Sequence, residues 1–285
     1  HWKGAPFPVF FYFGNEDNVE LYLNHTGLMW ETAPKMGALL IFAEHRFYGA
    51  SRPYPDGAPS CRRHLTTDQA LADFAVLIDN LRGKLSASSS AWIGFGGSYG
   101  GMMASWFRLK YPHMIDGVIA ASAPILTFLD MDPKYDDTAF MRVVTQDASP
   151  GGKKPNGCAA NFRKAQPAVW KLGQTPKGRR LISSAFRTCR LVNTTEEVEE
   201  LIQWMQAPWA TLAMGNFPYP SSYLIHGAKP PLPAWPVRAA CKPLEVLGSA
   251  AGERALMEAT REAVAVLYNH SGKVGCFFNG DKHDQ

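Results

Sequence analysis

The sequence predicts an α/β fold, because short apolar runs alternate along the first half of the chain with segments of helical periodicity. The apolar runs lie at residues 8–13, 38–43, 91–95 and 117–121. Each run is continuously hydrophobic, which is typical of parallel strands covered by helices on both faces. The later residues lack strong strand patterns, so we expect a sheet domain at 1–127 and a separate helical subdomain at 128–285.

Turn and cap signals place the individual elements. The first strand stops at Gly14, and the third runs into a glycine-rich turn at residues 96–101. The clearest helix begins at Thr66, a capping residue with Gln69 three positions later, and ends near residues 82–83. Its apolar positions, spaced as on one helix face, are Leu71, Phe74, Ala75, Ile78 and Leu81.

The remaining helices are less sharply marked. A second helix follows the glycine-rich turn and ends at Pro112, because proline cannot continue it. The subdomain contains helical stretches at residues 195–209 and 252–268, with a proline-rich loop at residues 217–236. We find no internal repeat.

Composition excludes several classes of protein. The chain has 285 residues, a net charge of +4 and a sequence pI near 8.7. Its basic residues are scattered rather than gathered in a stripe, so nucleic acid is not an expected partner. The longest apolar run, residues 37–43, is far shorter than the roughly 20 residues that span a bilayer, so no membrane partner is expected. The chain has no pair of cysteines at the Cys-x-x-Cys spacing that is typical of zinc and thioredoxin-like sites. We therefore expect neither a metal nor another cofactor.

Cysteines and glycosylation sequons indicate an oxidising compartment. Four of the five cysteines come after residue 150. N-glycosylation sequons begin at Asn24, Asn193 and Asn269. Together these features favour a secreted or lysosomal protein with disulfides, the alternative being three chance triplets in a cytosolic protein. The chain begins at His1 without a Met or a signal peptide, so we expect a processed or truncated N-terminus.

The segment at residues 96–101 predicts a nucleophilic serine. It consists of Gly-Gly-Ser-Tyr-Gly-Gly between an apolar strand and an amphipathic helix, as does the nucleophile elbow of an α/β-hydrolase. Ser98 would stand at the helix N-terminus, and the Tyr99 amide would point toward the oxyanion. Crowding between strand and helix would be relieved by glycine at positions 96, 97, 100 and 101. The alternative is a glycine-rich turn with an incidental serine.

A second oxyanion donor is expected from the loop that follows an early strand. Gly14-Asn15-Glu16 occupies that place after the strand at 8–13. We therefore predict Gly14 and Asn15 as members of the oxyanion hole. An ordinary strand-to-helix turn explains these residues equally well.

Several longer motifs resemble those of one peptidase family. The motifs lie at residues 13–16, 42–49, 69–74, 96–102, 110–114, 120–124, 212–214, 217–220, 232–236 and 268–272. Together they resemble the lysosomal Pro-X carboxypeptidase and dipeptidyl peptidase II family of serine peptidases over nearly the whole chain. The segments at residues 106–108 and 233–236 are closer to the carboxypeptidase branch.

The resemblance implies an α/β-hydrolase domain with a helical cap, and cleavage next to proline at one end of a peptide. An apolar pocket for the proline ring is implied between cap and hydrolase domain. The residues that we expect near the substrate are Glu16, Trp209, Met214, Tyr219 and Trp235. Ordinary packing in the hydrophobic core of the cap explains the last four residues equally well. The implied partner is a peptide with proline near the cleaved end, and the protein could form a homodimer.

The resemblance also suggests how the late cysteines pair. The implied disulfides are Cys158–Cys241 and Cys189–Cys276. Sequence alone allows three pairings of four cysteines. Cys61 is then left single.

The chain differs from the family pattern in two respects. In α/β-hydrolases the triad follows the order Ser, Asp, His, and the family's Asp and His lie beyond the cap. Residues 281–284 offer Asp and His without a preceding strand, so we interpret them as a polar terminus. The histidines in sequons or framework motifs, which are poor candidates for the base, are His25, His45, His113 and His270. Asp17 stands where the family has glycine.

We therefore predict a fragment holding the nucleophile, oxyanion loop and cap of a Pro-X carboxypeptidase-like serine exopeptidase, with the triad Asp and His outside this chain. The alternatives are a dipeptidyl peptidase II-like aminodipeptidase and a non-catalytic hydrolase-fold binding protein. A lipase or esterase is less favoured, since the motifs extend far beyond the elbow. The expected location is the lysosome or the outside of the cell.

Overall fold

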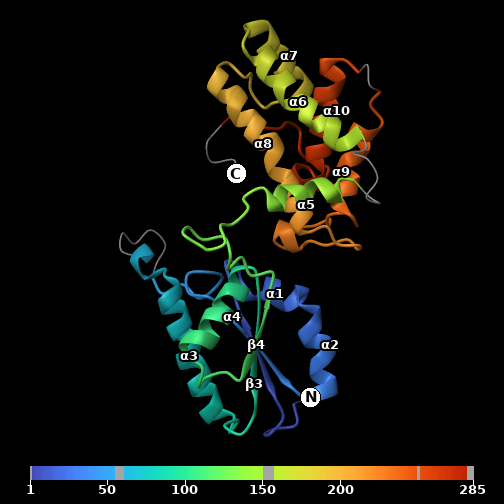
Figure 1. The fold of residues 1–285 in the computed structure, drawn as a ribbon. Helices are drawn as coiled ribbons and strands as arrows, with labels where there is room; N and C mark the ends of the chain where they lie inside the picture. The colour runs from blue at the N-terminus through green and yellow to red at the C-terminus, as the bar shows by residue number, and fades with distance from the viewer. Residues whose placement is uncertain (1, 55–60, 150–156, 249–250, 281–285) are drawn as a thin grey trace. The chain divides into compact units, whose positions relative to one another are not determined.

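A computed structural model describes residues 2–54, 61–149, 157–248 and 251–280. The chain forms two compact units, residues 1–135 and 136–285. Figure 1 colours the first unit from blue to green and the second from green through yellow to red. The boundary predicted after residue 127 lies in the segment without helix or strand that precedes the second unit.

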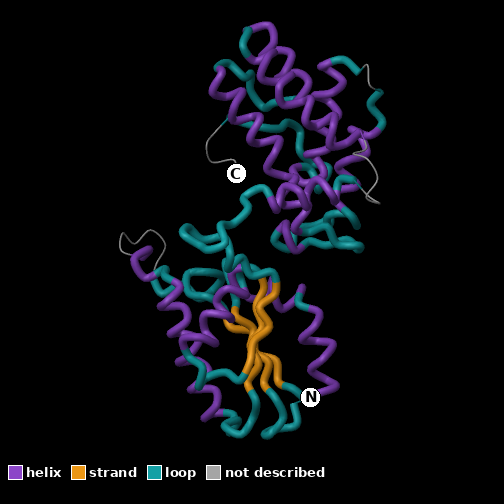
Figure 2. Tube along the Cα trace, in the orientation of Figure 1, coloured by secondary structure: helices purple, strands orange, loops and turns teal. Residues whose placement is uncertain are grey.

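Four parallel strands form the sheet of the first unit. They are β1 (Val9–Phe13), β2 (Leu39–Ala43), β3 (Trp92–Gly97) and β4 (Gly117–Ala121). Their order across the sheet is β2-β1-β3-β4, so β1 and β3 are central (Figure 2). All three pairings are parallel, as the continuous apolar runs predict.

The register aligns the carboxyl ends of the strands. Phe13 of β1 pairs with Ala43 of β2, and Gly97 of β3 pairs with Ala121 of β4. The segments that follow the four strands therefore leave the sheet at one edge. This is the edge at which open α/β sheets bind their ligands.

Helices cover both faces of this sheet. They are α1 (Val19–His25), α2 (Gly27–Met36), α3 (Thr67–Lys84) and α4 (Tyr99–Lys110), with a short 3₁₀ helix at Cys61–His64. Figure 1 shows α3 and α4 on one side of the sheet, and α1 and α2 on the other. Helix α3 begins where the cap signal predicts, because the Thr66 hydroxyl accepts a hydrogen bond from the Gln69 amide at 3.3 Å.

Strand β1 shows why both faces need a cover. All five of its side chains are buried. Phe11 and Phe13 pack against Phe74 of α3, with ring centroids 5.9 and 5.3 Å apart. Tyr12 points to the other face, where its ring stacks on Tyr22 of α1 at 5.5 Å. Alternate residues of a strand face opposite sides, so a strand without a polar position requires helices on each.

The described residues of the second unit form helices and loops without a strand, as predicted. The helices are α5 (Ala139–Asp147), α6 (Gly157–Gly173), α7 (Pro176–Phe186), α8 (Thr195–Met214), α9 (Pro236–Glu245), α10 (Glu253–Tyr268) and a short 3₁₀ helix at Tyr223–Ile225. Helix α8 continues beyond its expected end at residue 209 and contains Pro208. No described helix combines the length and the apolar composition that a bilayer crossing needs.

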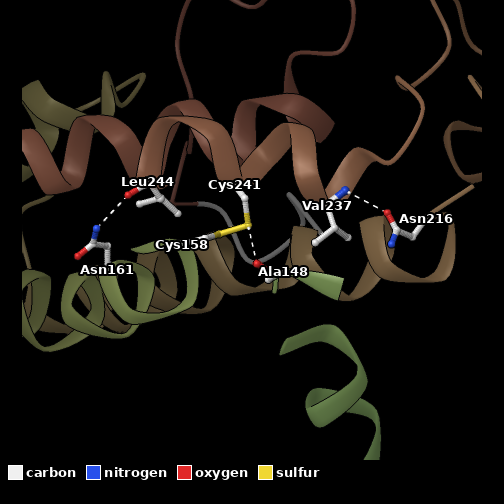
Figure 3. Close-up of a disulfide and its surroundings, with 7 residues drawn as sticks. All are labelled: Ala148, Cys158, Asn161, Asn216, Val237, Cys241 and Leu244. Carbon is white, nitrogen blue, oxygen red and sulfur yellow. Dashed lines mark hydrogen bonds between the residues drawn. A yellow bond between two sulfur atoms is a disulfide. The ribbon is translucent and has the colours of Figure 1, made fainter. Parts of the chain in front are cut away.

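Two disulfides brace the second unit. They join Cys158 to Cys241 and Cys189 to Cys276, the pairing that the family resemblance implies. The first bond links α6 to α9, and beside it the buried Asn161 side chain donates to the Leu244 carbonyl at 2.9 Å (Figure 3). A disulfide and a side-chain hydrogen bond thus both join α6 to α9. The thiol of Cys61 lies outside the described part of the chain, so its single state stays a prediction.

Candidate active site

Ser98 occupies the turn between β3 and α4. Its backbone dihedrals are φ 53° and ψ −124°, and non-glycine residues rarely adopt a positive φ. Strain of this kind costs about 1–3 kcal/mol and persists only where the surrounding structure enforces it. Here the Ser98 amide donates to the Ala121 carbonyl of β4 at 3.0 Å, which ties the turn to the sheet. The Ser98 side chain is exposed at the N-terminal end of α4.

Three glycines allow the strand and the helix to approach closely at this turn. A Cβ on Gly96 would lie 2.1 Å from the Gly100 carbonyl oxygen, and one on Gly100 would lie 2.6 Å from the Phe13 carbonyl oxygen. A Cβ on Gly101 would lie 3.0 Å from the Ala121 carbonyl oxygen. These neighbours are backbone atoms that cannot move aside without displacing a strand or the helix. The predicted relief of crowding therefore holds at these three positions.

Gly97 differs, and the prediction is wrong at this position. The atom nearest to a Cβ on Gly97 would be the Tyr12 hydroxyl oxygen, 3.8 Å away, which is an ordinary contact. Gly97 is also not among the residues with a positive φ. An alanine fits at Gly97 because its methyl group would make only an ordinary contact, whereas at Gly96 it would overlap the helix backbone.

The backbone N–H of Tyr99 is placed to bind an oxyanion. Tyr99 is the first residue of α4, and its N–H has no acceptor among the described residues. The helix dipole places positive partial charge at the same end. A negative oxygen that forms when Ser98 attacks a carbonyl carbon would be stabilised there.

The loop after β1 offers a second donor at Asn15 rather than at Gly14. The Gly14 amide donates to the Ala43 carbonyl of β2 at 2.9 Å, which continues the strand pairing. The Gly14 N–H therefore already has an acceptor, which makes Asn15 the better candidate for the second donor, and the predicted place of Gly14 in the oxyanion hole stays a prediction. Glycine is needed at this position because a Cβ on residue 14 would lie only 2.2 Å from the same Ala43 carbonyl oxygen and would push the two strands apart.

Asn15 lies buried against the first turn of α4, with 2% of its surface exposed. Its Oδ1 would lie 3.1 Å from a Cβ on Gly100, and it accepts no hydrogen bond from a described residue. Its backbone N–H also has no acceptor within the described chain. Asn15 therefore stays the predicted partner of Tyr99 in the oxyanion hole.

The two acidic residues of this loop have different surroundings. Asp17, at the family's glycine position, accepts a hydrogen bond from the Asn18 amide at 2.7 Å. Glu16 is exposed. Burial raises the pKa of both Tyr48 and Tyr99, and the negative charge of Glu16 contributes to each rise. The Glu16 charge is thus felt at the hydroxyls of Tyr48 and Tyr99, and its place beside the substrate stays a prediction.

The Tyr99 side chain belongs to a hydrogen-bonded group that includes His45, which the sequence assigned only to a framework motif. His45 follows β2, and 1% of its surface is exposed. Its Nδ1 is 2.6 Å from the Arg46 carbonyl oxygen, and its Nε2 is 3.3 Å from the Tyr99 hydroxyl. That hydroxyl is also 3.0 Å from the Thr67 hydroxyl at the start of α3. No sequence signal joins these residues, because they belong to three separate segments.

No histidine of the described first unit is hydrogen-bonded to the predicted nucleophile. Within residues 2–54 and 61–135, the Ser98 hydroxyl makes no hydrogen bond to a histidine, although a nucleophilic serine needs such a partner. The Asp and His of residues 281–284 lie outside the described residues. The described ranges also hold no group of three His, Cys, Asp or Glu side chains arranged to bind a metal ion.

The candidates of the second unit occupy two kinds of surroundings. Trp209 is 4% exposed, and its ring centroid lies 5.0 Å from that of Phe162 in the core. It borders a cavity of about 350 Å³, but its indole nitrogen is buried and has no hydrogen-bond partner among the described residues. Met214, Tyr219 and Trp235 are 59, 58 and 37% exposed. The structure thus favours the core alternative for Trp209 and leaves the other three accessible.

Two loop segments bring the exposed aromatic candidates together. The Trp235 amide donates to the Phe217 carbonyl at 2.7 Å. Tyr219 stacks on Phe217 with ring centroids 5.4 Å apart. The Arg238 guanidinium lies 4.4 Å from the Trp235 ring centroid, a cation–π contact. These contacts form an exposed aromatic surface on the second unit that carries a cation.

The sequon asparagines differ in exposure. Asn24, in the last turn of α1, and Asn193, before α8, are exposed. Asn269 is half-buried, and its Oδ1 accepts a hydrogen bond from the Val274 amide at 2.8 Å. Glycosylation stays a prediction at all three, with Asn269 the least accessible.

Comparison with known proteins agrees with this geometry. The family model for serine carboxypeptidase S28 matches residues 1–282. The lysosomal Pro-X carboxypeptidases of Homo sapiens and Bos taurus are 39% and 40% identical to this chain over 280 residues, which cover 97% of the chain and 54% of each relative. The prolyl carboxy peptidase like protein 5 of Caenorhabditis elegans is 37% identical over 273 residues, which cover 93% of the chain and 51% of that relative. The chain therefore spans about half the length of the curated relatives it matches.

Proposed function

Because this chain belongs to the serine carboxypeptidase S28 family, we propose that it carries the nucleophile and the oxyanion hole of a serine exopeptidase that cleaves peptides next to proline. The observation that carries the proposal is the strained, exposed Ser98 at the end of β3. The amide of the next residue has no acceptor among the described residues. A serine held in this way at a helix N-terminus is what acyl transfer needs.

The proposed reaction has two stages. Ser98 Oγ attacks the carbonyl carbon of the scissile bond, while a histidine takes the hydroxyl proton. The carbonyl oxygen becomes negative and is stabilised by the Tyr99 and Asn15 amides. The intermediate then breaks its C–N bond, the amine leaves with the proton from the histidine, and an acyl-serine remains. Water, deprotonated by the same histidine, attacks the acyl-serine. The C–Oγ bond then breaks and the histidine returns the proton to Ser98 Oγ, which releases the acid and restores the serine.

The histidine and the aspartate that orients it are proposed to lie outside residues 1–285. Two points support this placement. No histidine of the described first unit is hydrogen-bonded to Ser98. In α/β-hydrolases the Asp and His follow the nucleophile in the order Ser, Asp, His. Without them, only the smaller acceleration from the oxyanion hole and binding would remain.

The proposed substrate is a peptide with proline near its cleaved end, since the mammalian relatives are named Pro-X carboxypeptidases. Met214, Tyr219 and Trp235 are proposed to contact it, because they are exposed and aromatic faces pack well against a proline ring. Glu16 favours a second candidate, a dipeptidyl peptidase II-like activity. A carboxylate near the elbow would attract the free amine of a peptide N-terminus.

The protein is proposed to act in the lysosome or outside the cell. The mammalian relatives are named lysosomal. The two disulfides of the second unit persist best in an oxidising compartment, and the three sequons fit the same route. A homodimer stays a prediction.

Fluorophosphonate labelling tests the nucleophile in both the 285-residue chain and the full-length protein. We expect the full-length protein to be labelled and Ser98→Ala to lose all labelling. Ser88→Ala, which removes another exposed serine hydroxyl of the same unit, should keep it. A folded full-length protein that is not labelled would favour the non-catalytic binding protein. Labelling of the shorter chain would place the base within it.

Two peptide series distinguish the end that is attacked. An N-acetylated peptide ending in Pro-Phe with a free carboxylate reports carboxypeptidase activity. A free-amine Lys-Pro amide of a fluorescent leaving group reports dipeptidyl peptidase activity. We expect cleavage of the first series only. Cleavage of the second, weakened by Glu16→Gln, would instead support the aminodipeptidase.

A further inference from the structure

His45 is a buried histidine that the proposed reaction does not use. Its ring packs against Tyr48, Phe74 and Tyr99, with centroids 5.2, 6.4 and 5.6 Å away. An imidazole in such surroundings is costly unless both of its nitrogens are hydrogen-bonded. Both are, one to the Arg46 carbonyl and the other to the Tyr99 hydroxyl.

The partners decide where each proton of this group lies. A carbonyl oxygen only accepts, so the 2.6 Å contact with Arg46 requires a proton on His45 Nδ1. Burial lowers the pKa of His45, which favours the neutral ring, so Nε2 is the acceptor. The Tyr99 hydroxyl therefore donates to Nε2. Because the Tyr99 hydroxyl has only one proton and donates it to His45, it must accept a hydrogen bond from the Thr67 hydroxyl, 3.0 Å away. The hydrogen bonds thus run in one direction, from Thr67 through Tyr99 to His45.

Helix α3 anchors both ends of this chain of hydrogen bonds. Thr67 is the first residue of α3. The Arg46 side chain binds Asp73, two turns further along the helix, with Nε–Oδ2 and Nη2–Oδ1 distances of 2.6 and 2.7 Å. Arg46 also donates to the Gln69 side chain and to the His64 carbonyl. A bidentate pair of this kind fixes the loop that carries His45 against α3.

Tyr99 connects this anchor to the nucleophile. It follows Ser98 directly, and its backbone N–H is the proposed oxyanion donor, while its side chain ends in the hydrogen bonds to His45 and Thr67. We propose that His45 and Thr67 are positioning residues, which hold the Tyr99 side chain and thereby keep the first turn of α4 and Ser98 in the strained conformation that the reaction needs. This inference rests on the proposed function, since it assigns a role to groups around the same serine.

The effect on the rate follows from the geometry of attack. Displacing a reacting group by about 1 Å can cost about a hundredfold in rate. A strained φ such as that of Ser98 persists only where the surrounding structure enforces it. Loss of the Tyr99 hydroxyl would therefore slow the reaction of the serine with any acylating or phosphonylating reagent. It would change substrate affinity much less.

Hydroxyl-deletion variants of the full-length protein test the proposal. The variants are Tyr99→Phe, Thr67→Val and Thr67→Ser, with Tyr268→Phe as matched control. Like Tyr99, Tyr268 donates its hydroxyl proton in a hydrogen bond, but the acceptor is the Trp204 carbonyl, 2.9 Å away in the second unit. The readouts are the second-order rate of fluorophosphonate labelling and, for a cleaved peptide, kcat and KM.

We expect Tyr99→Phe and Thr67→Val to label about tenfold to a hundredfold more slowly. kcat should fall while KM stays within about twofold, as for an interaction that matters in the transition state. Thr67→Ser should restore the rate because it keeps the hydroxyl, and Tyr268→Phe should label like the unmodified protein. Unchanged rates in Tyr99→Phe and Thr67→Val would overturn the proposal. If Tyr99→Phe does not fold, the labelling rate of Thr67→Val alone tests the proposal.

Amide hydrogen exchange provides a readout that does not depend on activity. Peptides covering residues 98–103 should exchange faster in Thr67→Val than in the unmodified protein or in Thr67→Ser. Failure of the unmodified protein to label would refute the proposed function, and exchange would then decide the positioning role alone. If the unmodified protein does not label and exchange is also unchanged in Thr67→Val, the proposed positioning role is overturned.

Discussion

The first unit holds its candidate nucleophile in a turn tied to a sheet by backbone atoms, whereas the second unit carries its candidate residues at a helix end and on loops of a disulfide-braced helical body. In the first unit, Ser98 is held by a hydrogen bond to β4 and by glycines whose neighbours are carbonyl oxygens. In the second unit, Met214, Tyr219 and Trp235 stand on a helix end and on loops that belong to a disulfide-braced helical body.

This difference teaches what each unit tolerates. Backbone atoms in a sheet cannot move separately, so a single added methyl group can displace the nucleophile. Packed helices can adjust their side chains, so the second unit should depend less on single methyl groups and more on its crosslinks. Four predictions test this comparison.

The largest effect is expected from the disulfide between α6 and α9. Replacing Cys158 and Cys241 by alanine removes a crosslink between residues 83 apart, which should cost about 4 kcal/mol because the unfolded chain gains freedom. Hydrogen-exchange mass spectrometry should show faster exchange in α6 and α9, with little change in the sheet. The comparison would be broken if the strands of the first unit lost protection to the same extent. Cys61→Ser is the control.

A methyl group at the elbow should have the next largest effect. Gly96→Ala should destabilise the first unit by about 3 kcal/mol and abolish fluorophosphonate labelling, since its Cβ would overlap the helix backbone. Gly97→Ala adds the same methyl group one residue away, where the nearest atom is 3.8 Å off, and should leave stability nearly unchanged. Denaturant unfolding compares the two variants. Equal losses would show that crowding does not explain these glycines.

Helix caps should matter equally in both units, because a cap is a local contact. The Thr66 hydroxyl accepts from the Gln69 amide at 3.3 Å, and the Thr194 hydroxyl accepts from the Glu197 amide at 3.2 Å. Thr66→Ala and Thr194→Ala should each cost about 1 kcal/mol in the free energy of unfolding. The second variant keeps the sequon at Asn193. A much larger loss in one unit would mean that its cap has a tertiary role.

The last effect is a change of stability with pH that belongs to the first unit. Burial, with a smaller contribution from the Arg46 charge, lowers the pKa of His45 below its ordinary 6.5, while the hydrogen bond to the Arg46 carbonyl and the charges of Asp73 and Glu16 act in the opposite direction. Between the lowered pKa and 6.5 the unfolded chain binds the proton and the folded chain does not. Stability should therefore fall as the pH drops below about 6.5, and level off below the folded pKa.

His45→Gln tests this pH dependence, because it removes the titrating group and keeps a polar side chain. Urea unfolding at several pH values between 8 and 5 should show a flatter slope in the variant, whatever its absolute stability. Parallel slopes in both proteins would mean that His45 does not cause the dependence.

Much of the fold could be predicted because its signals are local. Continuous apolar runs identify parallel strands, a threonine with a polar residue three positions later marks a helix start, and the glycine-rich turn after β3 identifies Ser98. Each of these signals is a few residues long, and the physical reason for it acts within those residues. The disulfide pairing came from family resemblance, since spacing alone permits three pairings.

The roles of single residues in the site depended on contacts between distant segments. The Gly14 amide is used by the Ala43 carbonyl, which only the pairing of β1 with β2 decides. Gly97 lies among glycines that relieve crowding, but the direction in which its Cβ would point depends on the path of the whole turn. Burial separates Trp209 from the exposed Trp235.

The sequence by itself determined the parallel sheet, the helical second unit and the turn that carries Ser98, the proposed nucleophile, because these follow from periodicity, capping and turn chemistry within short segments. The tertiary structure alone decided which amides remain available for an oxyanion and which side chains stand behind the serine. Those outcomes depend on hydrogen-bond partners that the fold brings together from separate segments. His45, Thr67 and Tyr99 come from three such segments and meet at the hydroxyl of Tyr99, the residue that follows Ser98.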